Sequence, residues 1–291
     1  MTEQENGANE TPAQPKVRMG GMALRNGLLV HGPTHWAVAV RAKSGEIEVA
    51  SGPKPNLARG RIATTPMLRG PARLAEAMAV IPLVRWKLRS VRLPLEDARV
   101  IGAAIIAGGA SAAARKLAKG NATREALVGV IGLIPAVAAL RDPDLAAYHG
   151  AEHKAIGAYE SGGNAADTPK EHERCGSNLI GPMLALSVAG QVIVESVFER
   201  PGSIARGTAS LAATGAAVEV FAFAEREPAA ALSRAVHHTG HEIQRLISTR
   251  EPTPEQLAVG EAAVAELLRV EADPADRDPE GGPGASAPIP T

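Results

Sequence analysis

Aromatic residues and cysteine are scarce in this chain of 291 residues, which has two Trp, two Tyr, three Phe and one Cys. The single cysteine, Cys175, excludes a disulfide within the chain and suits a reducing compartment. Basic and acidic residues balance at 31 each, so no net charge attracts nucleic acid and we expect no nucleic-acid partner. Hydrophobic residues make up 45% of the chain, which is enough for a large core and excludes a wholly disordered protein.

The two ends of the chain differ in composition from the part between them. Residues 1–18 contain Val17 as their only large aliphatic residue, and residues 272–291 are acidic and rich in Pro and Gly, so both are predicted to be disordered tails. The first tail has no apolar run, and we expect no secretion signal in it. Residues 19–58 hold short runs typical of β-strands, with a turn at Ser44-Gly45, and predict a small β-rich antiparallel element.

Basic residues outnumber acidic residues in the segment 59–99. Its apolar residues keep a helical spacing, with an expected interruption at Pro82. A basic amphipathic helical segment of this kind lies on an anionic membrane surface or packs against a partner helix. The alternative is a solvated basic face over an ordinary core.

Four apolar runs follow, at residues 100–114, 126–140, 176–194 and 207–224. They predict a mainly α-helical protein in which residues 100–250 form a membrane-embedded bundle of about four apolar helices, before a C-terminal helix at 251–271. The first two runs are shorter than the roughly 20 residues of a spanning helix, but flanking Arg and Lys side chains could extend them by snorkelling. Membrane lipid is therefore an expected partner, together with partner membrane proteins or further copies of the chain. A soluble Ala-rich bundle is the alternative.

The stretch RDPDLAAYHGAEHKAIGAYESGG predicts a helix over residues 143–161. Asp142 is a suitable N-cap, Pro143 suits the first helical position, and Gly162 provides the stop. Two histidines and a glutamate fall on the stripe of this helix that also carries its large apolar residues. Ionisable groups on such a face need a partner or a metal ion.

The spacing of these three residues indicates a metal site. His149 and His153 lie one helical turn apart and could bind one cation, and the order H-x-x-E-H is that of the inverzincins, in which the Glu acts on water at the metal. Glu152 is thus the expected catalytic base. The expected cofactor is a divalent metal, with zinc favoured because it suits imidazole combined with thiolate or carboxylate. The alternative is a pair of buried histidines hydrogen-bonded to Glu152 and the tyrosines.

Two residues are candidates for a further ligand. Glu219 is the one charge inside the fourth apolar run and has no basic neighbour in the sequence nearby, and a carboxylate inside a membrane marks a functional site by default. Cys175, in the motif HERC, is either a soft metal ligand or a small buried residue. His172, Tyr148 and Lys154 are candidates to support the ligands from outside the metal's own coordination.

Four motifs occur in the order in which they appear in the YqhQ-like family of bacterial membrane proteins: GPTHWAVAVR, YHGAEHKAIGAYE, HERCGSN and STREPTPEQLAV. Over roughly residues 19–270 the chain resembles this family, which is described only as predicted metal-dependent enzymes of unknown function. The resemblance implies a multi-pass protein of the bacterial cell membrane. The residues at the family's motif positions are His149, Glu152, His153, His172 and Cys175. The chain departs from the family at Glu173, where a proline is usual.

The leading hypothesis is therefore an integral membrane protein that acts as a metal-dependent hydrolase on an unidentified substrate. One alternative is a membrane scaffold or assembly factor without enzymatic activity. Another is a soluble helical metal-binding protein.

Overall fold

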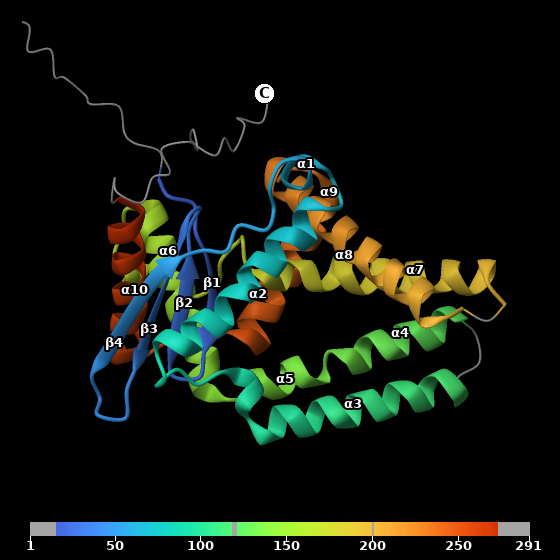
Figure 1. The fold of residues 1–291 in the computed structure, drawn as a ribbon, viewed down its shortest axis with the longest axis horizontal. Coiled ribbons are helices and arrows are strands. Elements are labelled where there is room, and N and C mark those ends of the chain that lie inside the picture. The colour runs from blue at the N-terminus through green and yellow to red at the C-terminus, as the bar shows by residue number, and fades with distance from the viewer. Residues whose placement is uncertain (1–15, 118–120, 200, 273–291) are drawn as a thin grey trace, which may run out of the picture.

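The computed structural model describes residues 16–117, 121–199 and 201–272, and these residues form a mainly helical protein with one small sheet (Figure 1). The greater part of each predicted tail, residues 1–15 and 273–291, lies outside the described residues. Where the described chain begins, the N–H of Val17 donates a hydrogen bond to the hydroxyl of Tyr159 at 2.8 Å. The chain is thus held against the folded part before the sheet begins.

The sheet is an antiparallel meander whose strands lie in chain order: β1 (Gly20–Leu24), β2 (Gly27–His31), β3 (His35–Arg41) and β4 (Ile47–Pro53). The turn predicted at Ser44-Gly45 connects the last two strands, and Gly45 has the positive φ of 93° that favours glycine there. Both faces of the sheet are covered, which explains why six consecutive residues of β3 are buried.

Different helices cover the two faces of the sheet (Figure 1). On one face, Leu28 and Val30 pack with apolar residues of α6 (Pro143–Ser161) and α10 (Pro254–Ala272). On the other face, Trp36 and Val38 pack with Val80 and Val84 of α2 (Arg69–Lys87). The sheet and these three helices therefore form one layered unit with two apolar cores.

Short helices flank α2, namely α1 (Arg61–Thr64) and the 3-10 turn η1 (Pro94–Glu96). The expected interruption at Pro82 is wrong, because α2 continues through this residue. Proline removes one backbone hydrogen bond from a helix. Since Pro82 lies on the exposed side of α2, the packed side of the helix, with Val80 and Val84, stays intact.

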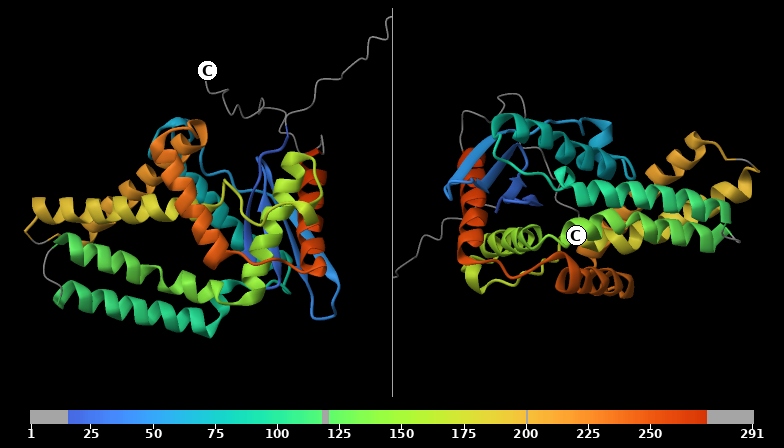
Figure 2. Two further views of the ribbon diagram at one scale, coloured as in Figure 1. Left: turned by 180° about the vertical axis from the view of Figure 1, so that it is seen from behind. Right: turned by 90° about the horizontal axis from the view of Figure 1, so that it is seen from below.

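The apolar helices project from this unit side by side, as both views in Figure 2 show. They are α3 (Ala98–Leu117), α4 (Asn121–Gly132), α5 (Ile134–Leu140), α7 (Ile180–Val197) and α8 (Ser203–Arg226). Helix α4 contacts both α3 and α7, and α7 contacts α8. The bundle is therefore a row of neighbouring antiparallel helices.

Three stretches among the described residues are long and apolar enough to cross a membrane by length and composition: Ala122–Leu140, Gly176–Val197 and Ser203–Arg226. Few of their residues are buried within the protein. Large apolar side chains point outward instead, such as Ile193 at 61% and Leu211 at 67% exposure. Continuous apolar surface of this kind is typical of helices that contact lipid or another protein.

The predicted helix with the HxxEH motif is α6, and its ends are those that the sequence indicates. The carboxylate of Asp142 accepts hydrogen bonds from the N–H groups of Asp144 and Leu145 at 3.0 and 3.4 Å, and Gly162 ends the helix in the left-handed conformation, with a φ of 75°.

Two short turns follow α6, namely η2 (Ala165–Asp167) and η3 (Gly176–Leu179). After the bundle, α9 (Ala231–Ile243) continues into the π-helical turn η4 (Gln244–Ser248). Thr253 and Gln256 then form a reciprocal cap at the start of α10, with hydrogen bonds of 3.0 and 3.3 Å.

Candidate metal centre

Three potential metal ligands meet beside α6. His149 and His153 project from this helix, and Cys175 is the N-cap residue of η3. One ligand atom from each of the three residues lies within 4.8 Å of those of the other two. The Sγ atom of Cys175 is 3.5 Å from Nε2 of His149, and the two imidazole ring centroids are 4.5 Å apart. The structure thus brings together both predicted histidines and one of the two candidates for a further ligand.

Backbone carbonyls fix the proton position on both imidazoles. The Nδ1–H of His149 donates to the carbonyl of Ser248 at 2.7 Å, and the Nδ1–H of His153 donates to the carbonyl of Lys170 at 2.6 Å. Because Nδ1 carries the proton, the lone pair of each neutral ring is on Nε2. Metal-binding histidines are usually held in this way by a carbonyl or a carboxylate behind the ring.

The surroundings keep His153 neutral. Burial, and to a lesser degree electrostatic repulsion from nearby His149, hold the pKa of His153 well below the usual value, and the hydrogen bond to Lys170 opposes this only in part. At neutral pH the Nε2 lone pair of His153 is therefore available to a cation.

The thiol of Cys175 is almost fully buried, and burial raises its pKa. The N–H of Ser177, which donates to Sγ at 3.5 Å, partly offsets this effect because it stabilises the thiolate. A neutral thiol is therefore the resting form, and a metal cation would have to displace its proton.

Glu152 lies next to the ligand group, and it is not one of the three grouped residues. Its side chain is buried beneath β1, so closely that a Cβ atom added to Gly21 would lie 2.5 Å from Oε1. Burial raises the pKa of Glu152 to about 7, with His149 lowering it and Cys175 raising it. A carboxyl group with a pKa near neutrality can accept a proton and return it.

A buried amide joins the two segments that support the site. Gln244 is 1% exposed; its Oε1 accepts a hydrogen bond from the N–H of His172 at 2.7 Å, and its Nε2 donates to the carbonyl of His172 at 3.1 Å. These two bonds tie the loop that carries Cys175 to the turn η4, whose Ser248 carbonyl holds His149.

A glycine lets that turn approach α6. A Cβ atom added to Gly150 would lie 2.1 Å from the carbonyl oxygen of Arg250, and the N–H of Arg250 donates to the carbonyl of Ala146 at 2.9 Å. The segment after η4 therefore lies directly on the backbone of α6, one residue from His149.

No sequence signal could have pointed to Ser248 or Lys170, because both act through a backbone carbonyl that every residue has. Gln244 could have been noticed as a polar residue between the apolar Ile243 and Leu246, but this pattern also suits an exposed side chain.

Of the predicted supporting residues, His172 lies beside the group. Its ring centroid is 5.7 Å from that of His153. Its Nε2–H donates to Glu160 at 3.1 Å, and its Nδ1 accepts from the N–H of Arg174 at 3.3 Å. Both nitrogens are thus engaged by protein, which suits a supporting residue better than a ligand.

Tyr148 and Lys154 have other surroundings. Tyr148 is buried in the core between α6 and the sheet. The ammonium group of Lys154 is buried and forms an ion pair with Glu251 at 2.5 Å. Tyr148 therefore has the contacts of a core residue, and Lys154 has those of one partner in a partly buried ion pair.

Glu219, the other predicted ligand, does have a basic partner, which corrects the expectation drawn from its apolar run. Nε of Arg69 donates to its carboxylate at 2.9 Å, Nη2 of Arg69 makes a second bond, and the N–H of Met67 donates at 3.2 Å. The carboxylate therefore fixes the start of α2 against α8 and is not among the grouped ligand residues.

A family model described as a protein of unknown function (DUF1385) matches residues 91–270 of the chain. No curated protein and no solved structure matches the chain. The matched segment spans more than half of the chain and contains His149, His153 and Cys175. The chain therefore belongs to this family of proteins of unknown function.

Proposed function

We propose that this protein binds a divalent metal ion, zinc, through His149, His153 and Cys175, and uses it in a hydrolytic reaction. The observation that supports this most strongly is the grouping of one ligand atom from each residue within 4.8 Å. Given zinc bonds of about 2.0–2.3 Å, two donors on a tetrahedral ion lie roughly 3.5 Å apart. The separation of 3.5 Å between Sγ of Cys175 and Nε2 of His149 fits this requirement.

The donor set also suits a catalytic site. Two imidazoles and one thiolate are three protein ligands, which leaves a fourth position for water or substrate. A zinc ion held there would supply a Lewis acid for water and for the carbonyl or phosphoryl oxygen of a substrate.

Glu152 is the proposed general base. Its carboxyl group is buried beside His149 and Cys175 under the backbone of β1, so it is shielded from bulk water and held in one position. It would accept a proton from the attacking water and return it to the leaving group.

We further propose that the protein spans the bacterial cell membrane several times. Three candidate spans and their outward-facing apolar side chains support this, as does the resemblance to the YqhQ-like family. Cys175 directly precedes the candidate span Gly176–Val197, so the ligand group would lie at the end of a span. A substrate at the membrane surface is therefore favoured.

The variant Glu152→Gln tests the enzymatic role, because it keeps the shape of the side chain and removes its basicity. We expect this variant to retain metal and to fail to replace the wild-type protein in cells that lack it. Cells rescued as well as by wild type would contradict the hydrolase and favour the scaffold. In the same cells, washing the membranes at alkaline pH tests the spans, since release of the protein without detergent would contradict them.

A further inference from the structure

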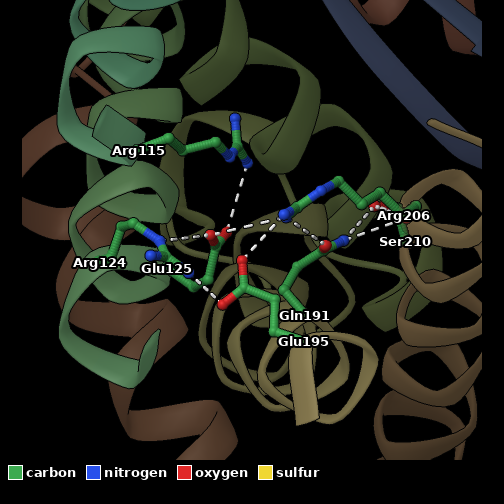
Figure 3. Close-up of polar contacts among 7 residues, drawn as sticks. All are labelled: Arg115, Arg124, Glu125, Gln191, Glu195, Arg206 and Ser210. Atoms are coloured by element: carbon green, nitrogen blue, oxygen red, sulfur yellow. Dashed lines mark hydrogen bonds and ion pairs between the residues drawn. The ribbon is translucent and has the colours of Figure 1, made fainter. Parts of the chain in front are cut away.

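The far ends of the bundle helices carry a cluster of charged residues that the proposed hydrolase does not use (Figure 3). We call Arg115 of α3, Arg124 of α4 and Arg206 of α8 the distal arginines. Between them lie Glu125 of α4 and Glu195 of α7, whose side chains are only 2% and 7% exposed.

The three distal arginines share these two carboxylates. Arg124 contacts Glu125 at 3.4 Å and also pairs with Glu195. Arg206 pairs with Glu195 at 2.9 Å and lies 3.8 Å from Glu125. Arg115 has one ion pair, to Glu125 at 3.3 Å, and its side chain is 41% exposed. Three guanidinium groups against two buried carboxylates leave one positive charge in excess.

A cavity opens onto this excess charge. It has a volume of about 290 Å³, and all three distal arginines, Glu195 and Phe198 line it. Glu199 also lies at the cavity, but it is exposed, so water screens its charge more than that of the buried carboxylates. The cavity therefore offers guanidinium groups to an anion from outside.

The position of the cavity identifies the chemistry of the anion. Arg124 lies near the start of the candidate span Ala122–Leu140, Glu195 near the end of Gly176–Val197, and Arg206 near the start of Ser203–Arg226. The ends of spans lie at the depth of the lipid headgroups. A guanidinium group matches the oxygens of a phosphate group better than any other cationic side chain does.

We infer that this cavity binds the phosphate group of an anionic phospholipid, with Arg115 as the principal contact. Arg115 has the fewest ion pairs of the distal arginines, so it can turn toward a ligand while Arg124 and Arg206 stay close to Glu125. The inference depends on the proposed membrane spans and not on the metal site. The competing explanation is an ion-pair network that only holds the helices together, and it requires no lipid.

The test uses the full chain, purified in detergent and depleted of lipid. Its melting temperature is measured against increasing phosphatidylglycerol, phosphatidylcholine or inorganic phosphate, for wild type, Arg115→Gln and Lys116→Gln. Lys116 provides the matched control, because it is an exposed cation on the same turn of α3 and does not line the cavity. Zinc content is measured in the same samples.

We expect phosphatidylglycerol to raise the melting temperature of the wild type at lower concentration than the other two ligands do. The half-saturating concentration of phosphatidylglycerol should rise about tenfold in Arg115→Gln, because this variant loses one charge-assisted hydrogen bond. It should stay unchanged in Lys116→Gln. If the two lipids raise the melting temperature equally, or if both variants lose the same affinity for phosphatidylglycerol, the inference is overturned. If inorganic phosphate has the same effect as phosphatidylglycerol, a lipid is not the source of the bound phosphate group. We expect the same zinc content in all of these samples. A failure of the lipid inference can therefore be told apart from a failure of the metal site.

Discussion

Gln244 bonds to both backbone groups of His172, accepting from its N–H at 2.7 Å and donating to its carbonyl at 3.1 Å. The residues lie 72 positions apart in the chain, and this contact sets the distance between the loop of Cys175 and the turn that holds His149. The geometry of the ligand group thus depends on a side chain that is not a ligand.

Gln244→Ala should weaken metal binding as well as folding. It leaves the N–H of His172 without its partner and removes one of the two hydrogen bonds to the carbonyl of His172, which also accepts from the N–H of Cys175 at 3.2 Å. This loss costs about 2 kcal/mol and loosens the loop that carries Cys175. The measurements are the urea midpoint and the zinc dissociation constant. Gln191→Ala is the control, because this buried glutamine bonds Arg206 and Ser210 in the bundle and should lose stability without losing zinc affinity. If both variants bind zinc equally, Gln244 does not position the site.

Gly150→Ala should damage the site through the backbone. Its Cβ would lie 2.1 Å from the carbonyl oxygen of Arg250, so the segment after Ser248 must move away from α6. We expect a loss of about 1–3 kcal/mol in stability, typical of overpacking, and weaker zinc binding because the Ser248 carbonyl moves from His149. Gly102→Ala, where nothing lies within 4 Å of the added Cβ, should be neutral or stabilising. Unchanged zinc affinity in Gly150→Ala would contradict this account.

Most features that could be predicted from the sequence depend on residues that lie close together in the chain. The ends of α6 follow from Asp142 and Gly162, and the helical spacing of His149 and His153 places both imidazoles on one side. Contacts between distant segments could not be predicted. Glu219 looked like an unpaired charge because its partner, Arg69, lies 150 residues earlier in the chain. The choice between Glu219 and Cys175 required the position of Cys175 beside His149 of α6, which only the folded chain shows.

Glu219→Gln should leave the metal site intact. The carboxylate bonds Arg69 and Met67, so the variant loses an ion pair between α2 and α8 but no contact to the ligand group. We expect unchanged zinc content with a lower melting temperature. A loss of zinc comparable to that of Cys175→Ser would contradict the separation of Glu219 from the site.

Zinc affinity should rise with pH. Burial raises the pKa of the Cys175 thiol, so zinc must displace a proton across the neutral range, and apparent affinity should increase about tenfold per pH unit. His153 contributes little between pH 7 and 8, because its pKa lies well below the usual value and it is already neutral. Competition titrations from pH 7 to 8 should show this slope in wild type and a flatter one in Cys175→Ser. An equal slope in both proteins would exclude the thiol as the group that loses the proton.

The most direct test is the zinc content of the purified protein, measured by mass spectrometry of the metal. We expect one zinc ion per chain in the wild type and close to none in the double variant His149→Ala/His153→Ala. The double variant His238→Ala/His241→Ala removes two exposed imidazoles elsewhere and should keep the full amount. Negligible zinc in the wild type, or equal zinc in the wild type and the His149/His153 variant, would contradict the metal centre.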